Sequence, residues 1–129
     1  MIVEAAIVLC LTNATDTAVF GRVRDSRFKT TSAKLSGNSL TYREPLAEAP
    51  FPSVAAGQTD CATVDALTLA KPQLVLWSRQ PVVDTTTGIP VEHEGDATCR
   101  PAAAPQAGQR LTFVYRKSLL GLSTCKETR

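Results

Sequence analysis

Hydrophobic and polar residues alternate along several short segments of this chain. The clearest is the segment 110–117, in which Leu111, Phe113 and Tyr115 occupy every second position. Successive side chains of a β-strand point to opposite faces of its sheet, so this pattern predicts a strand with one face in a core. Similar segments, rich in Val, Thr, Leu and aromatic residues, lie between clusters of turn-forming residues. The strands predicted in this way span residues 2–12, 17–24, 27–35, 39–43, 60–69, 73–79 and 110–117.

The segment 74–77 differs from the others because it is apolar on both faces. Such a strand is typical of the centre of a sheet that is covered on both sides, and Pro72 and Pro81 stand where they can end it. Residues 36–39 have the composition of a hairpin turn. Residues 119–122 form a last apolar patch, for which the sequence leaves open a strand or one helical turn.

Two stretches lack a strand pattern. Residues 44–52 contain three prolines, and residues 81–108 form a long segment without clear periodicity. Long loops in compact domains often carry functional or interaction elements, so we expect function in the loop 81–108. Within it, four apolar residues have the composition of a short edge strand. These residues are Val82, Val83, Ile89 and Val91.

No segment shows the 3.6-residue periodicity of an amphipathic helix. A chain of 129 residues is long enough for one domain with a sizeable core and too short for two ordinary domains. The predicted fold class is therefore all-β. We expect a single domain over residues 1–129, folded as an antiparallel β-sandwich or Greek-key barrel with one long irregular loop at 81–108.

Four cysteines are dispersed along the chain, at Cys10, Cys61, Cys99 and Cys125. No C-x-x-C pair is present, which disfavours zinc and thioredoxin-type sites. An even, dispersed set suits one or two disulfides in an oxidising compartment, with three connectivities open for two bridges, and buried thiols are the alternative. This favours a virion or an extracellular location over the cytoplasm. Residues 13–15 also fit the N-glycosylation pattern.

The longest apolar run, residues 5–11, is much shorter than the roughly 20 residues that a helix needs to cross a bilayer. We therefore expect no membrane span. The residues ahead of the run include Glu4 and no Lys or Arg, which argues against a signal peptide. We expect the run to belong to the fold.

The one histidine of the chain, His93, lies between Glu92 and Glu94 in the stretch VEHEGDATCR, residues 91–100. Adjacent side chains of an extended chain diverge, so these groups converge on a cation or a substrate only if the loop bends. The spacing matches neither a calcium loop nor a helical H-E-x-x-H pair, and nucleophile-elbow and phosphate-binding motifs are absent. We interpret the stretch as a solvated acidic loop and expect no catalytic residues, metal site or cofactor.

Charge is segregated along the chain, with a net charge of +3 over residues 1–43, −5 over 44–109 and +4 over 110–129. If the strands predicted at 17–24 and 27–35 pair, five basic side chains form a strip suited to a polyanion or a protein partner. These are Arg22, Arg24, Arg27, Lys29 and Lys34. Nucleic acid is the weaker candidate, because the pI of about 8.4 and the aromatic content of 5% are low for such binding.

The pattern as a whole favours a non-enzymatic structural or interaction protein, a self-assembling or assembly-decorating β subunit of the coat, decoration or filament type. Its partners would be copies of itself or a host assembly, met through oppositely charged patches and an apolar N-terminal segment that adds a strand to a neighbouring sheet. The alternative is a secreted, disulfide-bonded monomer acting as an effector, inhibitor or lectin-like binding module. A hydrolase or metal enzyme built around His93 is a third hypothesis.

Overall fold

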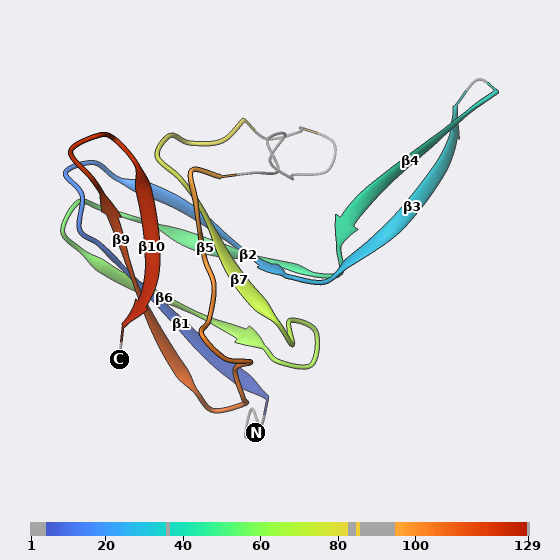
Figure 1. Cartoon of the computed structure of the whole chain (residues 1–129). Helices are drawn as coiled ribbons and strands as arrows, with labels where there is room; N and C mark the ends of the chain where they lie inside the picture. Colours follow the sequence, from blue (N-terminus) through green and yellow to red (C-terminus); the bar gives the residue numbers. More distant parts are fainter. Residues whose placement is uncertain (1–4, 36, 83–84, 86–94, 129) are drawn as a thin grey trace.

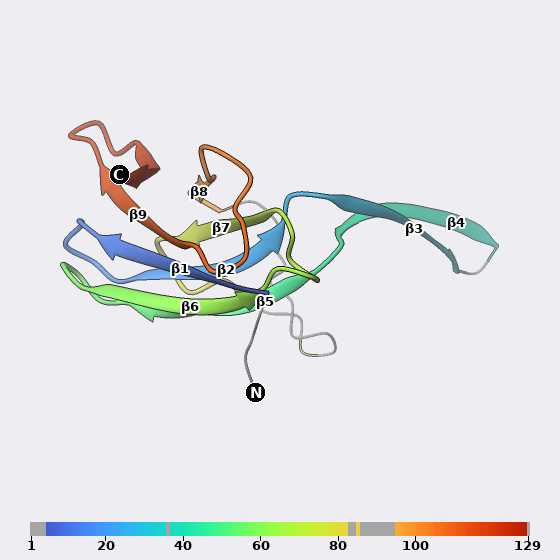
Figure 2. The same cartoon turned by 90° about the horizontal axis from the view of Figure 1, so that it is seen from below.

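Two four-stranded sheets pack face to face, and a two-stranded hairpin projects from one end of the pair (Figures 1 and 2). The structure is a computed structural model that describes residues 5–35, 37–82, 85 and 95–128. The described residues form strands and no helix. The all-β prediction is confirmed, and of its two forms the molecule is the open β-sandwich rather than the closed barrel.

Sheet A has the strand order β10-β9-β1-β6, in which the strands span Ser123–Thr128, Arg110–Lys117, Ala6–Asn13 and Thr59–Asp65. Its pairs are antiparallel except for β1 with β9, which run parallel with Leu9 opposite Leu111. The apolar segment near the N-terminus is thus the central strand of the protein's own sheet. The expectation that it adds a strand to a neighbouring sheet is wrong, because β1 already has a partner on each side.

Sheet B has the strand order β5-β2-β7-β8, in which the strands span Glu48–Val54, Val19–Asp25, Pro72–Trp77 and Ala97–Cys99. All of its pairs are antiparallel. The remaining strands, β3 (Phe28–Leu35) and β4 (Asn38–Pro45), pair only with each other and form the projecting hairpin. We call this hairpin the arm.

The core lies between the two sheets and consists of alternate residues of their strands. Sheet A contributes Ile7, Leu9, Leu11, Leu111, Phe113 and Tyr115 among others, and sheet B contributes Val19, Val23, Phe51, Leu74 and Leu76 among others. The alternation predicted for the segment 110–117 is confirmed, since Leu111, Phe113 and Tyr115 are each at most 8% exposed. Burial of this apolar surface is the main force that holds the sheets together.

Two disulfides close the structure, as the spacing of the cysteines suggested. Cys10 and Cys61 face each other across the β1–β6 pair within sheet A, 51 residues apart in sequence. Cys99 of β8 and Cys125 of β10 join the two sheets at the edge opposite the β5–β6 connection. The β5–β6 connection joins the two sheets at one edge of the sandwich, and the Cys99–Cys125 disulfide joins them at the other.

Three strands were missed in the sequence. Strand β10 begins directly after the apolar patch 119–122, and β5 and β8 have atypical signals. Strand β5 lies in the proline-rich stretch, and it tolerates Pro50 and Pro52 because it is an edge strand that needs backbone donors on one side only. Strand β8 lies inside the segment 81–108 and is only three residues long. Val82 is exposed and outside any strand, and the other three residues of the proposed edge strand there lie outside the described residues.

The apolar patch 119–122 is neither strand nor helix but the turn between β9 and β10. Asn13, the first residue of the glycosylation triplet, ends β1 with its side chain fully buried. The Asn13 amide donates to the carbonyl oxygens of Thr17 and Val54, at 2.7 and 3.0 Å. This asparagine is therefore a structural pin between two turns and offers no free nitrogen for a glycan.

Candidate interaction surface

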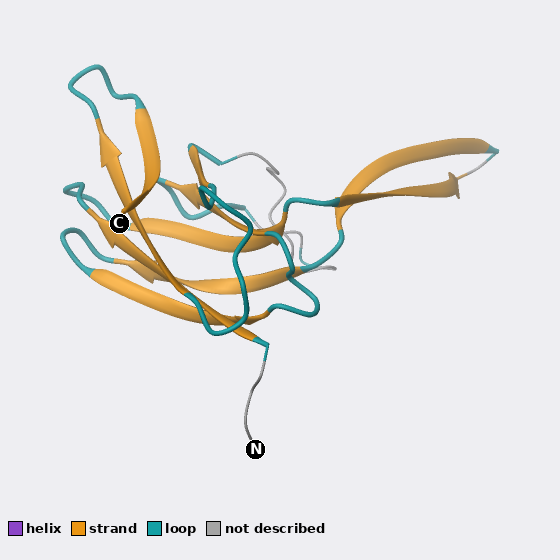
Figure 3. Cartoon of the chain, turned by 60° about the horizontal axis from the view of Figure 1, so that its bottom comes forward, coloured by secondary structure: helices purple, strands orange, loops and turns teal. Residues whose placement is uncertain are grey.

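The arm is the most unusual feature of the molecule. Its register runs from Phe28 opposite Pro45 to Leu35 opposite Asn38, eight residue pairs with a length of about 25 Å. Figures 1 and 3 show that it extends away from the sandwich. A two-stranded ribbon on its own is marginally stable in water, because neither of its faces is covered. A ribbon of this length outside the core is typical of an element that is completed by a partner.

The root of the arm is held firmly where it leaves the sandwich. Asp25, the last residue of β2, accepts from the guanidinium of Arg27 through both carboxylate oxygens, at 2.9 and 2.8 Å, and from the Arg27 backbone N–H at 2.8 Å. Backbone bonds from Asp25 N to Ala47 O and from Leu46 N to Arg27 O tie the two legs of the hairpin together. The direction in which the arm projects is therefore fixed by its root.

The side-chain hydrogen bond from Arg27 is the main reason why the pKa of Asp25 lies below its ordinary value, with backbone hydrogen bonds and the Arg27 charge acting in the same direction against burial. The Asp25 side chain is fully buried, whereas that of Arg27 is 42% exposed. A buried carboxylate needs this compensation in order to remain charged. The pair is thus a charged clamp at the junction of the sandwich and the arm.

The basic strip expected on two paired strands does not form, because β2 pairs with β5 and β7 while β3 pairs with β4. The pairing on which the expectation rested is wrong. Arg22 and Arg24 both bind the carboxylate of Glu48, at 2.7 and 2.8 Å. Lys29 lies 3.8 Å from Glu44, and Arg27 is clamped to Asp25. The side chain of Lys34 lies outside the described part.

The pairing of these charges explains the segregation seen along the sequence. Acidic residues of the central segment, such as Glu48, are folded against basic residues of the first segment. Part of the opposite charge of the first and central segments is therefore paired within one molecule. Binding of a polyanion by the five basic residues stays a prediction, and four of the five side chains already have a carboxylate partner.

The base of the arm exposes an aromatic–cation pair. The phenyl ring of Phe28 is 49% exposed, and the guanidinium carbon of Arg43 lies 4.7 Å from the ring centre. Stacking of this kind holds the arginine in place while its polar edge stays available. Large aromatic and arginine side chains dominate the binding energy of protein interfaces. Phe28 and Arg43 are therefore the best anchor residues of the arm, and the sequence analysis did not single them out.

Beside the root lies a cavity of about 320 Å³, lined by residues of β2, β3, β7 and β8. Arg24 and Arg100 bring two guanidinium groups to it, and Phe28 contributes its ring. The anchor residue of the arm thus also belongs to the wall of a hollow on the sandwich. The cavity therefore adjoins both the base of the arm and sheet B.

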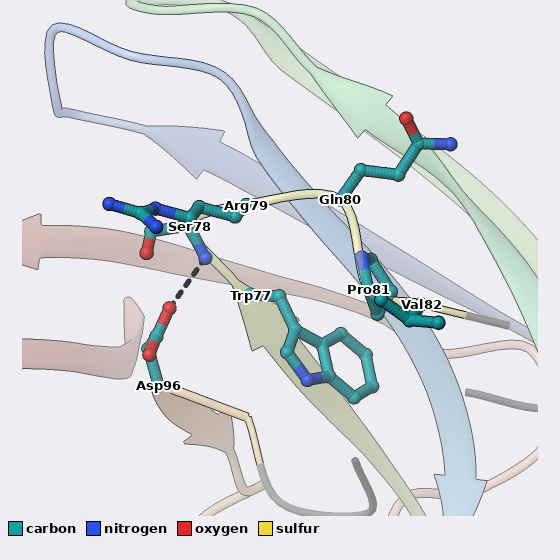
Figure 4. Close-up of a pocket in the computed structure, with 7 residues that line it drawn as sticks. All are labelled: Trp77, Ser78, Arg79, Gln80, Pro81, Val82 and Asp96. Atoms are coloured by element: carbon teal, nitrogen blue, oxygen red, sulfur yellow. Dashed lines mark hydrogen bonds between the residues drawn. The ribbon is translucent and has the colours of Figure 1, made fainter. Parts of the chain in front are cut away.

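A second cavity of about 340 Å³ lies along the chain that follows β7, and Figure 4 shows the side chains that line it. Asp96 accepts a hydrogen bond from the backbone N–H of Ser78 at 2.6 Å, and Trp77 lies on the side of Pro81 and Val82. The hydrogen bonds from Ser78 are the main reason why the pKa of Asp96 lies below its ordinary value, aided by the charges of Lys117 and Arg79.

Trp77 is a large buried residue, but it lies outside the core between the two sheets. It is 4% exposed, but it does not belong to the cluster between the sheets, because side chains alternate along β7 and Leu74 and Leu76 occupy the inner face. On the outer face Trp77 lies 5.7 Å from the guanidinium of Arg24. Among the described residues, none accepts a hydrogen bond from its buried indole N–H.

Of the stretch 91–100, residues 91–94 lie outside the described residues, and they include His93 and its two glutamate neighbours. Within the stretch, Asp96 is bonded to Ser78 and Cys99 is in a disulfide. In the described part of the chain, no three His, Cys, Asp or Glu side chains are grouped so that they could hold a metal ion. Among the described features, the arm is therefore the strongest candidate for a functional element.

Residues 5–35, 37–82, 85 and 95–128 include no helix long and apolar enough to cross a membrane. Comparison of the sequence with models of protein families and with curated proteins finds no match.

Proposed function

We propose that this chain is a non-enzymatic assembly subunit whose arm binds a neighbouring copy or a host assembly. The observation that carries the proposal is the arm itself: eight residue pairs stand outside the sandwich on a root that fixes their direction. Rigid presentation lowers the entropy lost on binding. Both outer edges of the hairpin also offer backbone donors and acceptors to an added strand.

The two disulfides support an oxidising setting, such as a virion or the exterior of a cell, because bridges of this kind rarely persist in reducing cytosol. They also brace a sandwich whose described residues form no helix. A subunit of a coat, decoration layer or filament needs this durability.

The test is to measure the mass of the disulfide-intact full chain in solution, by sedimentation or light scattering, over a range of concentration and salt. We expect an oligomer, and we expect a variant with Thr30–Arg43 replaced by a two-residue Asn-Gly turn to be a folded monomer. Phe28→Ala in the full-length chain should weaken the oligomer, whereas Leu67→Ala, at a leucine that is 82% exposed in another turn, should not. A full chain that is monomeric at every concentration and salt would contradict self-assembly.

A second candidate function is a secreted monomeric binding module, of the effector, inhibitor or lectin-like kind. Its specific support is the cavity beside Trp77, which the exposed side chain of Arg79 lines and where its guanidinium can donate hydrogen bonds to a small anionic or hydroxylated ligand. Monomeric behaviour together with saturable ligand quenching of the single tryptophan would favour this function over assembly.

A further inference from the structure

The β9–β10 turn presents three leucine side chains almost wholly to solvent. Leu119, Leu120 and Leu122 are 108%, 88% and 64% exposed, and we call these three residues the leucine tip. Single exposed leucines are ordinary on a protein surface, but three within four positions of one turn form a contiguous apolar projection. Their exposure costs free energy in water, so a contact that covers them would be favourable.

The turn that carries the leucine tip has a defined conformation. The backbone N–H of Ser118 donates to Leu122 O at 2.9 Å, and the N–H of Leu122 donates back to the Ser118 hydroxyl at 3.1 Å. Gly121 has a φ of +80°, a value that glycine adopts without strain. These bonds hold the leucines outward before any contact is made, which lowers the entropic cost of inserting them.

Cationic side chains surround the leucine tip. Arg116 and Lys117 precede it directly, and Lys126 follows on β10, two positions along from the partner of Arg116. All three are exposed, and in the part of the chain that the structure describes none forms an ion pair. We call these three residues the cationic collar. They contrast with the basic residues of β2 and β3, whose carboxylate partners are within the molecule.

Three carboxylates must be weighed against the collar, and one of them, Glu127 beside Lys126 on β10, accepts a hydrogen bond from the backbone N–H of Ala102 at 3.2 Å. Asp96 experiences the charge of Lys117, and its oxygen is occupied by the backbone N–H of Ser78. Asp16 is exposed in the β1–β2 turn, which lies at the same end of the sandwich (Figure 1). Residues 110–129, which carry the leucine tip, nevertheless have a net charge of +4, and this excess of positive charge favours an anionic partner.

The shape of the leucine tip limits which partner can cover it. A projecting apolar tip needs either an apolar hollow or a soft apolar surface. The two cavities described above bring charged side chains such as Arg79, Asp96, Arg24 and Arg100 beside their apolar ones, so neither is a purely apolar hollow for the tip of a second copy. A bilayer with anionic lipids offers both an apolar interior just below its surface and negative headgroups around the point of entry.

We propose that the leucine tip is a lipid-contact loop, which inserts into the headgroup boundary of an anionic bilayer while the cationic collar binds the headgroups. The tip and the arm lie at opposite ends of the molecule (Figures 1 and 2). A subunit held on a lipid surface by its tip would thus leave its arm free for a partner. The inference does not depend on the assembly proposal, since a monomer would bind lipid in the same way.

The experiment is flotation of the disulfide-intact full chain with vesicles of phosphatidylcholine alone, or of phosphatidylcholine with roughly a third phosphatidylserine. We expect binding to the anionic vesicles only, weakened by high salt because the collar is screened. The double substitution Leu119→Ser with Leu120→Ser should lower the partition coefficient about 100-fold, at about tenfold for each leucine that enters the apolar boundary. Leu67→Ser, at a leucine that is 82% exposed in the β6–β7 turn, is the matched control and should bind as the parent does.

Arg116→Gln with Lys117→Gln should weaken binding and flatten its salt dependence while the leucines stay in place. All of these side chains are exposed, so the thermal midpoints of the variants should match that of the parent and confirm that they are folded. Failure of the parent to float with anionic vesicles would overturn the proposal, as would equal loss in the Leu67 control. Loss of self-association, rather than of vesicle binding, in the leucine double variant would assign the tip to a second copy instead.

Discussion

The side chain of Asn13 provides the most direct test of how the turns at one end of the sandwich are held. Its amide N–H groups donate to Thr17 O and Val54 O, and its carbonyl oxygen accepts from the backbone N–H and the hydroxyl of Thr15, at 3.0 and 2.6 Å. One side chain thereby connects β1, the β1–β2 turn and the end of β5. Asn13→Ala removes all four bonds and leaves the backbone bonds of residue 13 in place.

The expected loss of unfolding free energy depends on whether water can reach the groups that lose their hydrogen bond to Asn13. Each intramolecular hydrogen bond contributes about 1 kcal/mol net, and a buried acceptor left without a donor costs somewhat more. Val54 O is buried and has no route to water without a local opening, whereas the Thr15 groups are partly exposed and can be solvated. We therefore expect a loss of about 3 kcal/mol in the free energy of unfolding. For a domain of this size the thermal midpoint should fall by about 10 °C.

Urea denaturation without reductant, followed by the emission of Trp77, measures this loss. Thr15→Val is the matched control, since it removes only the hydroxyl, which donates to Asn13 Oδ1 and to the carbonyl oxygen of Thr17, and should cost about 1 kcal/mol. Asn13→Asp should be at least as harmful as the alanine variant at neutral pH, because a carboxylate would face two carbonyl oxygens. If Asn13→Ala changed the free energy of unfolding by less than about 1 kcal/mol, the pin would be redundant and the reasoning refuted.

Three further predictions concern other parts of the fold. Replacing Cys99 and Cys125 together by Ala should cost about 3.5 kcal/mol, from the loop entropy of a bridge that spans 26 residues, as measured by urea unfolding. Asp25→Asn should cost about 2 kcal/mol near pH 7 because the charged clamp with Arg27 is lost. Gly95→Ala should destabilise the β7–β8 edge by about 2 kcal/mol, since a Cβ there would collide with a backbone carbonyl of β7, as seen in a lower thermal midpoint.

The pH dependence of the Asp25 variant has a definite sign. The folded-state pKa of Asp25 is lowered, so its contribution is fully present above the unfolded value near 3.8 and is lost as pH falls through the lower folded value. The gap between parent and Asp25→Asn should therefore be constant near neutrality and close only in strong acid. A gap that closed between pH 5 and 7 would contradict the clamp. Equal stability of the parent and the Cys99/Cys125 double variant would contradict a stabilising role of the disulfide. An unchanged thermal midpoint of Gly95→Ala would contradict the predicted collision at β7.

Much of the strand content could be read from the chain because the physical cause is local. Strand β9 was predicted with its observed bounds, since alternation over eight residues forces one face inward. Strand β5 was missed because prolines are compatible with a strand only where one edge is free, and an edge position is a property of the sheet, not of the segment. For the same reason β8 could not be found, since its three residues are held by β7 and by the disulfide to β10.

The candidate sites depended even more on distant contacts. The arm was predicted as two strands, but that it leaves the sandwich follows from β2 pairing with β5 and β7 rather than with β3. The basic residues on β2 looked free in the sequence and are bound to Glu48, more than 20 residues away along the chain. The exposure of the leucine tip could not be foreseen, because an apolar patch normally predicts burial.

By itself, the sequence determined the class of this protein: an all-β chain with alternating core positions and an even set of cysteines, for which bridges and buried thiols both stayed open. These properties follow from side-chain period, composition and chain length, each of which acts within a few residues. The tertiary structure alone decided which cysteines pair, which charges are neutralised, and which hairpin and turn remain uncovered. Those outcomes are set by register and sheet order, since each depends on segments that are far apart along the chain and meet only after folding.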